Sequence, residues 1–167
     1  WNTQDVVRSH GGIPVQSKTG HAFIKERMRA EDAAYGGEMS AHHYFRDFAY
    51  CDSGMLPWLL VAGIISVTRK PLSALVAERI ARVPCSGEIN REVRDPEAVL
   101  KAVRARYAPA AIAVDETDGL SFEYPQWRFN LRLSNTEALI RLNVESRGDI
   151  GLMQRQTAEI LTVVENL

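Results

Sequence analysis

A short stretch near residue 40 concentrates the side chains of this chain that could do chemistry. Residues 35–44 read Tyr-Gly-Gly-Glu-Met-Ser-Ala-His-His-Tyr, which places a carboxylate, a hydroxyl and two imidazoles beside a pair of glycines. Glycine lets a backbone turn sharply and approach a ligand closely. In an extended segment alternate side chains share one face, so Glu38, Ser40 and His42 would point the same way. Such a face predicts binding of adjacent sugar hydroxyls, with a titratable imidazole next to them.

A second polar segment reads Arg-Leu-Ser-Asn-Thr from Arg132 to Thr136 and joins two strand-like runs. A phosphate group favours a forked guanidinium, hydroxyl donors and free backbone N–H groups. Arg132 offers the first, and Ser134 and Thr136 offer the second. Asn135 tolerates the left-handed backbone that an amide nest needs, and Arg141 on the departing run adds charge. The alternative is an ordinary polar turn, and the spacing alone leaves both interpretations open.

Two further groups of basic residues have both a functional and a structural interpretation. Lys18 and His21 lie in a turn and could contribute to a site, or they could be a solvated lysine and a helix-capping histidine. The histidines at positions 42 and 43 could equally be surface or core residues. Because consecutive side chains of an extended segment point in opposite directions, His42 and His43 make a poor chelating pair, and we expect no metal site in this chain.

Composition excludes several classes of function. The chain has 167 residues, 46% of them hydrophobic, which fits one globular domain or two small ones. Its formal net charge of −1 gives no general attraction for nucleic acid or for an acidic membrane surface, so any anion site must be local. The cysteines suggest neither a disulfide framework nor a zinc site, and they fit reduced thiols in the cytoplasm. The apolar run over residues 55–67 is too short to cross a bilayer, so we expect no membrane span.

The apolar periodicity of the first half predicts alternating strands and helices, as in an α/β layered domain. Phe23 and Ile24 would face inward from the first of these helices. Strands are expected at residues 13–16, 33–35 and 44–45, and helices over residues 22–29, 55–68 and 72–81. Composition changes across residues 82–87. We therefore divide the chain into a partial α/β layered domain, residues 1–84, and a second domain, residues 85–167.

The second half has the pattern of a small α+β domain with a mostly antiparallel sheet and two helices. In the run that starts at Trp127, the side chains of Trp127, Phe129 and Leu131 would share one face. Residues 138–144, which follow the polar segment, show the same alternation of apolar and polar side chains. Strands are expected at residues 88–90, 111–114, 119–124, 127–131 and 138–144, and helices over residues 96–107 and 149–166.

The motif Gly-Glu-Met-Ser-Ala-His at residues 37–42, with Arg-Leu-Ser-Asn-Thr at residues 132–136 downstream, resembles the phosphomannomutase branch of the α-D-phosphohexomutase family. The likeness extends over essentially the whole chain. Residues 1–84 are similar to the last part of that family's third domain, and residues 85–167 to its fourth. The sequence starts at Trp1, in the middle of a secondary-structure pattern, so we interpret it as a piece of a longer protein. A processed mature protein is the alternative.

The resemblance implies a role for each matching residue. Glu38 and Ser40 would hold sugar hydroxyls, and His21 and His42 would be acid/base groups near the reacting end. Lys18 would add charge there. The non-transferred phosphate would be held by Arg132, Ser134, Asn135 and Thr136, with Arg141 in support.

The resemblance also implies an activity, the interconversion of mannose 6-phosphate and mannose 1-phosphate through an enzyme phosphoserine and a hexose 1,6-bisphosphate. Such an enzyme needs Mg²⁺ and feeds GDP-mannose and polysaccharide synthesis. The family's phosphoserine loop and metal loop are absent here, so we expect them in upstream domains and expect this chain to be inactive alone. Exposed strand edges could cause it to form oligomers. The alternatives are a phosphoglucomutase or dual-specificity enzyme, a non-catalytic sugar-phosphate-binding module, and a scaffold with polar turns.

Overall fold

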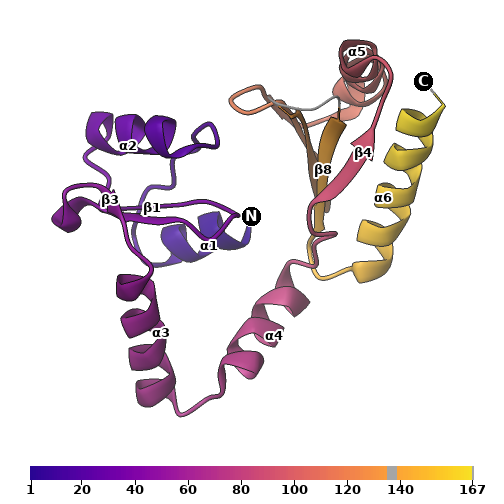
Figure 1. Cartoon of the computed structure of the whole chain (residues 1–167). Helices are drawn as coiled ribbons and strands as arrows, with labels where there is room; N and C mark the ends of the chain where they lie inside the picture. The colour runs from indigo at the N-terminus through magenta and orange to yellow at the C-terminus, as the bar shows by residue number, and fades with distance from the viewer. Residues whose placement is uncertain (135–138, 167) are drawn as a thin grey trace. The chain divides into compact units, whose positions relative to one another are not determined.

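The computed structural model describes residues 1–134 and 139–166, which divide into two spatial units (Figure 1). The smaller unit is Val15–Ala77, and the larger joins Trp1–Pro14 to Glu78–Leu167. These units are not the domains expected from the sequence, whose boundary between residues 84 and 85 stays a prediction. The architecture agrees with the expected class, an α/β part followed by an α+β part.

In the smaller unit, helix α2 (His21–Ala30) covers a three-stranded antiparallel sheet. Its strands are β1 (Tyr35–Gly37), β2 (His43–Phe45) and β3 (Cys51–Asp52), in that order, with the short helix η1 (Arg46–Phe48) between the last two. Ile24 and Met28 pack on Tyr44, whose side chain is fully buried. Glycine at position 36 permits this approach, because a Cβ there would lie 2.9 Å from Ile24 Cγ2.

Two expectations for this half were wrong. Residues 13–16 form no strand, and Ile13 is 87% exposed. No strand is paired with them among the described residues, and Pro14 has no N–H to donate to one. Phe23 does not face inward but is half exposed, because it lies in the first turn of α2 over Gly20, away from the sheet.

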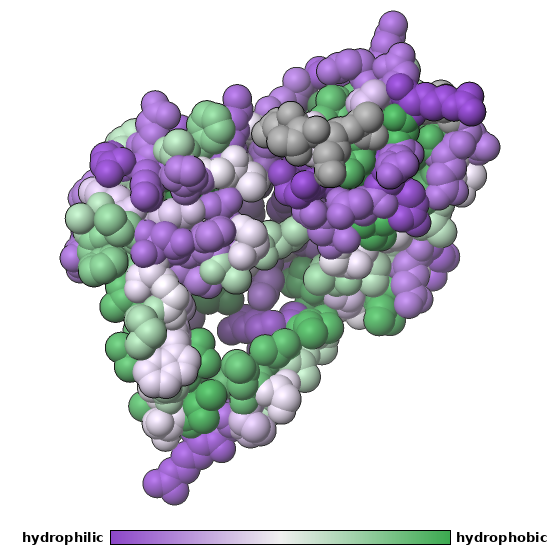
Figure 2. All heavy atoms as spheres, in the orientation of Figure 1, coloured by the Kyte–Doolittle hydropathy of each residue, from purple (hydrophilic) through white to green (hydrophobic). Residues whose placement is uncertain are grey.

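The helices α3 (Met55–Thr68) and α4 (Leu72–Arg82) follow, close to the predicted bounds. Ser53 lies just before α3, and its Oγ accepts a hydrogen bond of 3.3 Å from Leu56 N–H in the first turn of the helix. Exposed apolar side chains gather over α3 on the face seen in Figure 2. Trp58 and Leu60 of this helix are more than half exposed. Within the described part, no single helix is long and apolar enough to cross a membrane, although α3 and α4 would pass that test together as a bent pair.

The larger unit is built on a five-stranded antiparallel sheet in the order β4-β8-β7-β6-β5. Its helices are α1 (Asn2–Ser9), α5 (Pro96–Tyr107), the short η2 (Ala108–Ala110) and α6 (Ile150–Glu165). Its strands are β4 (Ile89–Glu92), β5 (Ala113–Asp115), β6 (Leu120–Glu123), β7 (Trp127–Leu133) and β8 (Leu139–Ser146). The predicted antiparallel sheet with two helices is confirmed: α5 lies between β4 and β5 in the chain, and α6 follows β8.

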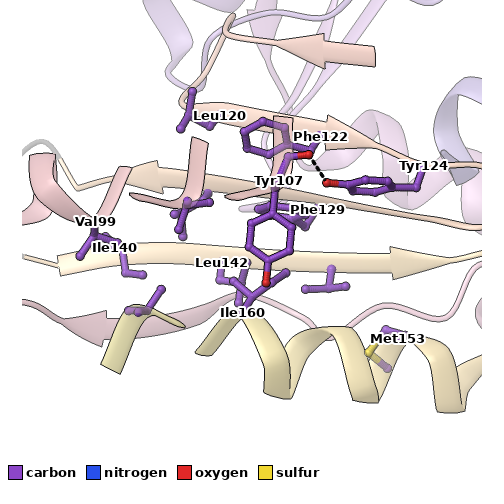
Figure 3. Close-up of a cluster of buried hydrophobic side chains, with 14 residues drawn as sticks. Val99, Tyr107, Leu120, Phe122, Tyr124, Phe129, Ile140, Leu142, Met153 and Ile160 are labelled. Carbon is purple, nitrogen blue, oxygen red and sulfur yellow. Dashed lines mark hydrogen bonds between the residues drawn. The ribbon is translucent and has the colours of Figure 1, made fainter. Parts of the chain in front are cut away.

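One face of this sheet carries the main core, shown in Figure 3. Phe129 and Leu131 are buried as the alternation predicted, and Ile160 of α6 is fully buried in the same cluster. Tyr124 OH donates a hydrogen bond of 2.6 Å to the backbone oxygen of Tyr107, which joins β6 to the end of α5 (Figure 3). Arg132, the first residue of the polar segment, lies near the end of β7 in the same sheet.

The segment before β4 is hydrogen-bonded to β8 through Ser86. Ser86 N–H donates to the Val144 oxygen at 2.9 Å, and Val144 N–H donates back to Ser86 Oγ at 2.9 Å. Gly87 then takes a φ of +69°, which glycine adopts without strain. The chain turns at Gly87, and Glu88 therefore lies beside β7 and β8.

Candidate functional site

An open pocket of about 420 Å³ lies in the smaller unit between α2 and the sheet. Its walls come from the start of α2, the β1–β2 turn, β2 and β3. The lining residues are Gly20, His21, Lys25, Glu38, Ser40, His42, Tyr44 and Asp52. Four of the residues expected from sequence, His21, Glu38, Ser40 and His42, are therefore brought together.

The segment that carries three of these residues is a tight turn and not the extended stretch that alternation suggested. Glu38 N–H donates to the His42 oxygen at 3.0 Å, and Ala41 N–H donates to the Glu38 oxygen at 3.1 Å. The strand register pairs Gly37 with His43, so the intervening residues must reverse the chain. Ala41 accordingly adopts a left-handed φ of 65°. The side chains reach one pocket because the turn encloses it, not because they alternate.

Glu38 connects the β1–β2 turn to the start of α2 through hydrogen bonds. Its Oε1 accepts from Tyr44 OH at 2.5 Å, and its Oε2 accepts from Gly20 N–H at 3.0 Å. Burial raises the pKa of Tyr44, and the hydrogen bond to the Glu38 carboxylate raises it further. The carboxylate is thus held in one orientation, and its remaining acceptor positions can meet hydroxyl groups in the pocket.

His42 pairs with Asp52 across the β2–β3 edge. His42 Nδ1 lies 2.6 Å from Asp52 Oδ2, while Asp52 Oδ1 accepts from His43 N–H at 2.9 Å. The hydrogen bond to Asp52 and its negative charge raise the pKa of His42, and the His42 bond in turn lowers the pKa of Asp52. Because Nδ1 faces the carboxylate, Nε2 is the ring nitrogen that can exchange a proton with a ligand.

The other basic residues of this unit differ in position. His43 does not line the pocket, and its Nδ1 lies 2.7 Å from Tyr35 OH, to which it is hydrogen-bonded. Lys18 is not part of the lining either, and its Nζ lies 5.9 Å from the centre of the Phe23 ring. The ammonium group that does line the pocket belongs to Lys25, one turn into α2.

In the larger unit, the two arginines expected to hold phosphate share one carboxylate. Arg132 Nη2 lies 3.0 Å from Glu88 Oε2, and Arg141 Nη1 lies 3.3 Å from Glu88 Oε1. The arginines are direct partners in the β7–β8 register. Ser134 N–H donates to the Leu139 oxygen at 2.9 Å. Asn135 and Thr136 lie outside the described residues.

Sequence reasoning missed Lys25, Tyr44, Asp52 and Glu88. Lys25 lies four positions after His21, and because α2 begins at His21, one residue before the predicted start, that spacing places both on one face of the helix. For Asp52 and Glu88 no local signal exists, since both reach their partners through strand pairing. Among the described residues no three His, Cys, Asp or Glu side chains come together as metal ligands, so the described donors do not fit a Mg²⁺ site.

Comparison with known proteins connects both units to one family. The model described as "Phosphoglucomutase/phosphomannomutase, alpha/beta/alpha domain III" matches residues 1–83, and "Phosphoglucomutase/phosphomannomutase, C-terminal domain" matches residues 88–163. A phosphomannomutase of Escherichia coli is 62% identical over 99% of this chain, and one of Vibrio cholerae is 54% identical over all of it. A Xanthomonas campestris protein named "Phosphohexose mutases" is 58% identical over 96% of this chain.

A crystal structure of a phosphoglucomutase/phosphomannomutase family protein from Burkholderia thailandensis has a TM-score of 0.74 and 27% identity over 98% of this chain. The chain spans only 36% of the length of the Escherichia coli relative and 35% of the crystallised chain. Because consecutive domain models, named relatives and a solved fold all agree, the chain belongs to the phosphoglucomutase/phosphomannomutase family and corresponds to its domain III and C-terminal domain.

Proposed function

We propose that this chain is the sugar- and phosphate-recognition part of a phosphomannomutase that interconverts mannose 6-phosphate and mannose 1-phosphate. The observation that carries the proposal is the pocket in which Glu38, Ser40 and His42 meet His21. A fixed carboxylate and a hydroxyl suit adjacent sugar hydroxyls, and two imidazoles suit an oxygen that gains or loses a proton. The relatives named phosphomannomutase support mannose as the sugar.

The chemistry of this chain's own residues is limited to binding and proton exchange. Glu38 and Ser40 would orient the sugar, and His42 Nε2 would hold or accept the proton of the reacting hydroxyl. Arg132 and Arg141 would hold the phosphate that is not transferred, together with the Ser134–Asn135–Thr136 hydroxyls and amides. We place the phosphoserine, and the ligands of a Mg²⁺ ion that neutralises phosphoryl charge, outside this chain.

A phosphoglucomutase or dual-specificity enzyme is the second candidate, because one similar protein is named "Phosphohexose mutases". Mannose and glucose differ at one hydroxyl, and such a difference gives modest discrimination unless the site contains a dedicated hydrogen-bond partner.

Binding by the purified chain tests the proposal. We would titrate it with mannose 1-phosphate and glucose 1-phosphate and follow backbone amide shifts by NMR. The proposal predicts shifts in the β1–β2 turn that disappear in Ser40→Ala and Glu38→Gln. As a matched control, Ser17→Ala changes a serine outside the pocket lining and should bind like the parent chain. Shifts elsewhere only, at millimolar sugar phosphate, would contradict the proposed site.

A further inference from the structure

Glu88 binds the two guanidinium groups that face each other on neighbouring strands. Arg132 and Arg141 are direct partners in the β7–β8 register, where like charges repel. Their side chains are 19% and 30% exposed, so water screens that repulsion only in part. The Glu88 carboxylate lies within 3.0 Å of one and 3.3 Å of the other and accepts a hydrogen bond from each with a separate oxygen. It therefore removes the main cost of keeping two cations side by side.

The carboxylate leaves the arginines able to bind a ligand. Each guanidinium contacts Glu88 through a single nitrogen, whereas arginine has five N–H donors. Two cations with one anion also keep a local charge that attracts an oxyanion. Arg141 Nε is buried and makes no hydrogen bond with the described residues, so it is not among the donors already used by Glu88.

We propose that Glu88 is a positioning residue that holds Arg132 and Arg141 together as one binding site for a phosphate dianion. The inference rests on the proposed function for the identity of the natural ligand, a sugar phosphate. It assigns the contact with phosphate to the arginines and the geometry of their pair to Glu88. The fastening of residues 83–86 to β8 and the turn at Gly87 keep the carboxylate in place.

The opposite role for Glu88 would be that of a competitor, which occupies the arginines until phosphate displaces it. The two roles predict opposite effects of Glu88→Gln, which keeps the size and removes the charge. A positioning residue predicts that phosphate binds roughly tenfold more weakly or worse, the scale of one charge-assisted hydrogen bond lost. A competitor predicts tighter binding.

The experiment titrates the purified chain with inorganic phosphate and follows the Nε–Hε signals of the arginine side chains and the amides of β7 and β8 by NMR. In the parent chain, the Arg132 and Arg141 signals should shift together with phosphate. In Glu88→Gln those signals should broaden or move before any phosphate is added, while the core amides stay in place. Glu88→Asp, which keeps the charge, should recover part of the affinity.

Glu92→Gln is the matched control, because it removes the same charge from an exposed position at the far end of β4, the strand that Glu88 precedes, and phosphate should bind it as it binds the parent chain. Equal or tighter binding to Glu88→Gln would overturn the inference, as would a parent chain that does not bind phosphate at the arginines. Neither result tests the sugar pocket, because the sugar-phosphate titration of that pocket uses variants of Glu38 and Ser40. The two proposals can therefore fail separately.

Discussion

His42 has two neighbours that determine its charge, and only one of them lies close to it in the sequence. Asp52 bonds its Nδ1 directly, and the Glu38 carboxylate acts on it at longer range. His21 and Lys25 also line the pocket, and the positive charge of Lys25 would oppose protonation of His42. The direct hydrogen bond is the largest contribution, so the pKa of His42 lies above its ordinary value.

Replacing Asp52 by Asn should therefore lower the pKa of His42. The amide keeps an oxygen for His43 N–H, so the β2–β3 edge is retained, while the charge and the acceptor for Nδ1–H are lost. Titration of the ring signals by NMR measures the change, and the neutral ring should also shift its proton toward Nε2. Asp47→Asn, an exposed carboxylate of the same unit that pairs with Arg46, should leave His42 unchanged. An unaltered His42 pKa in Asp52→Asn would contradict this account.

The same pair predicts a pH window for stability. Folding raises the pKa of His42 above 6.5, so its contribution is complete below that pH and disappears as pH rises through the folded-state value. Folding lowers the pKa of Asp52 below 3.8, so its contribution is complete above that pH and disappears as pH falls. The difference in thermal midpoint between the parent chain and Asp52→Asn should be largest between these values, and small in size because both side chains are exposed. A difference that grows steadily above pH 8 would contradict the assignment.

At the scale of elements, the turn before β6 contains Gly119, which has less room for a Cβ than the other described glycines. Gly119 has a φ of +74°, and a Cβ there would lie 2.5 Å from the Leu131 backbone oxygen and 2.7 Å from Arg132 Cα. Backbone atoms cannot move away without displacing β7. The turn therefore sets how closely β6 approaches the strand that carries Arg132.

Gly119→Ala should lower the free energy of unfolding by about 2–4 kcal/mol, since left-handed strain and overpacking add. Gly63→Ala is the control, because position 63 lies inside α3 with no atom near an added Cβ, and it should stabilise by about 0.5–1 kcal/mol. Urea denaturation measures both. Equal stabilities for the two variants would show that the close approach at Gly119 does not exist in solution.

Helix α3 is an element without a partner in the described structure. Its exposed side chains include Trp58, Leu59, Leu60 and Ile64, and a helix that is apolar on every side is normally buried. We expect Leu60→Lys to leave the fold intact and to reduce binding of a hydrophobic dye. Leu142→Lys, in the core of the larger unit, should unfold that unit. Circular dichroism and dye fluorescence separate these outcomes, and loss of structure in Leu60→Lys would mean that α3 is packed after all.

At the scale of the whole molecule, we expect recognition and catalysis to be separable. The described part has a pocket and an arginine pair but no cluster of three metal-binding side chains. The chain spans 36% of the length of its Escherichia coli relative. We therefore expect that it binds sugar phosphates without converting them.

The purified chain should give no mannose 6-phosphate from mannose 1-phosphate in the presence of Mg²⁺ and a hexose 1,6-bisphosphate. A coupled assay measures this, and the His42→Gln variant, purified in parallel, reports contaminating enzyme. Turnover that exceeds this background would contradict the prediction and would require a nucleophile within the chain.

Much of the local structure follows from neighbours in sequence. Asp95 and Asp149 cap α5 and α6, each by accepting from the N–H three residues on, at 3.0 and 2.8 Å. The alternation along β7 predicted that Phe129 and Leu131 share one face, and that face is buried in the core. These features depend only on residues of a single helical turn or a single strand, so the sequence alone is enough to predict them.

The sequence by itself also identified the two loops, since their residue types and order are particular to one family. Only the tertiary structure placed Asp52 beside His42 and Glu88 beside Arg132, and replaced the expected extended face with a turn. The reason is that strand register decides these contacts: Tyr44 pairs with Asp52 and Arg132 with Arg141 across the sheets. Register depends on how entire faces pack, and no residue encodes it locally.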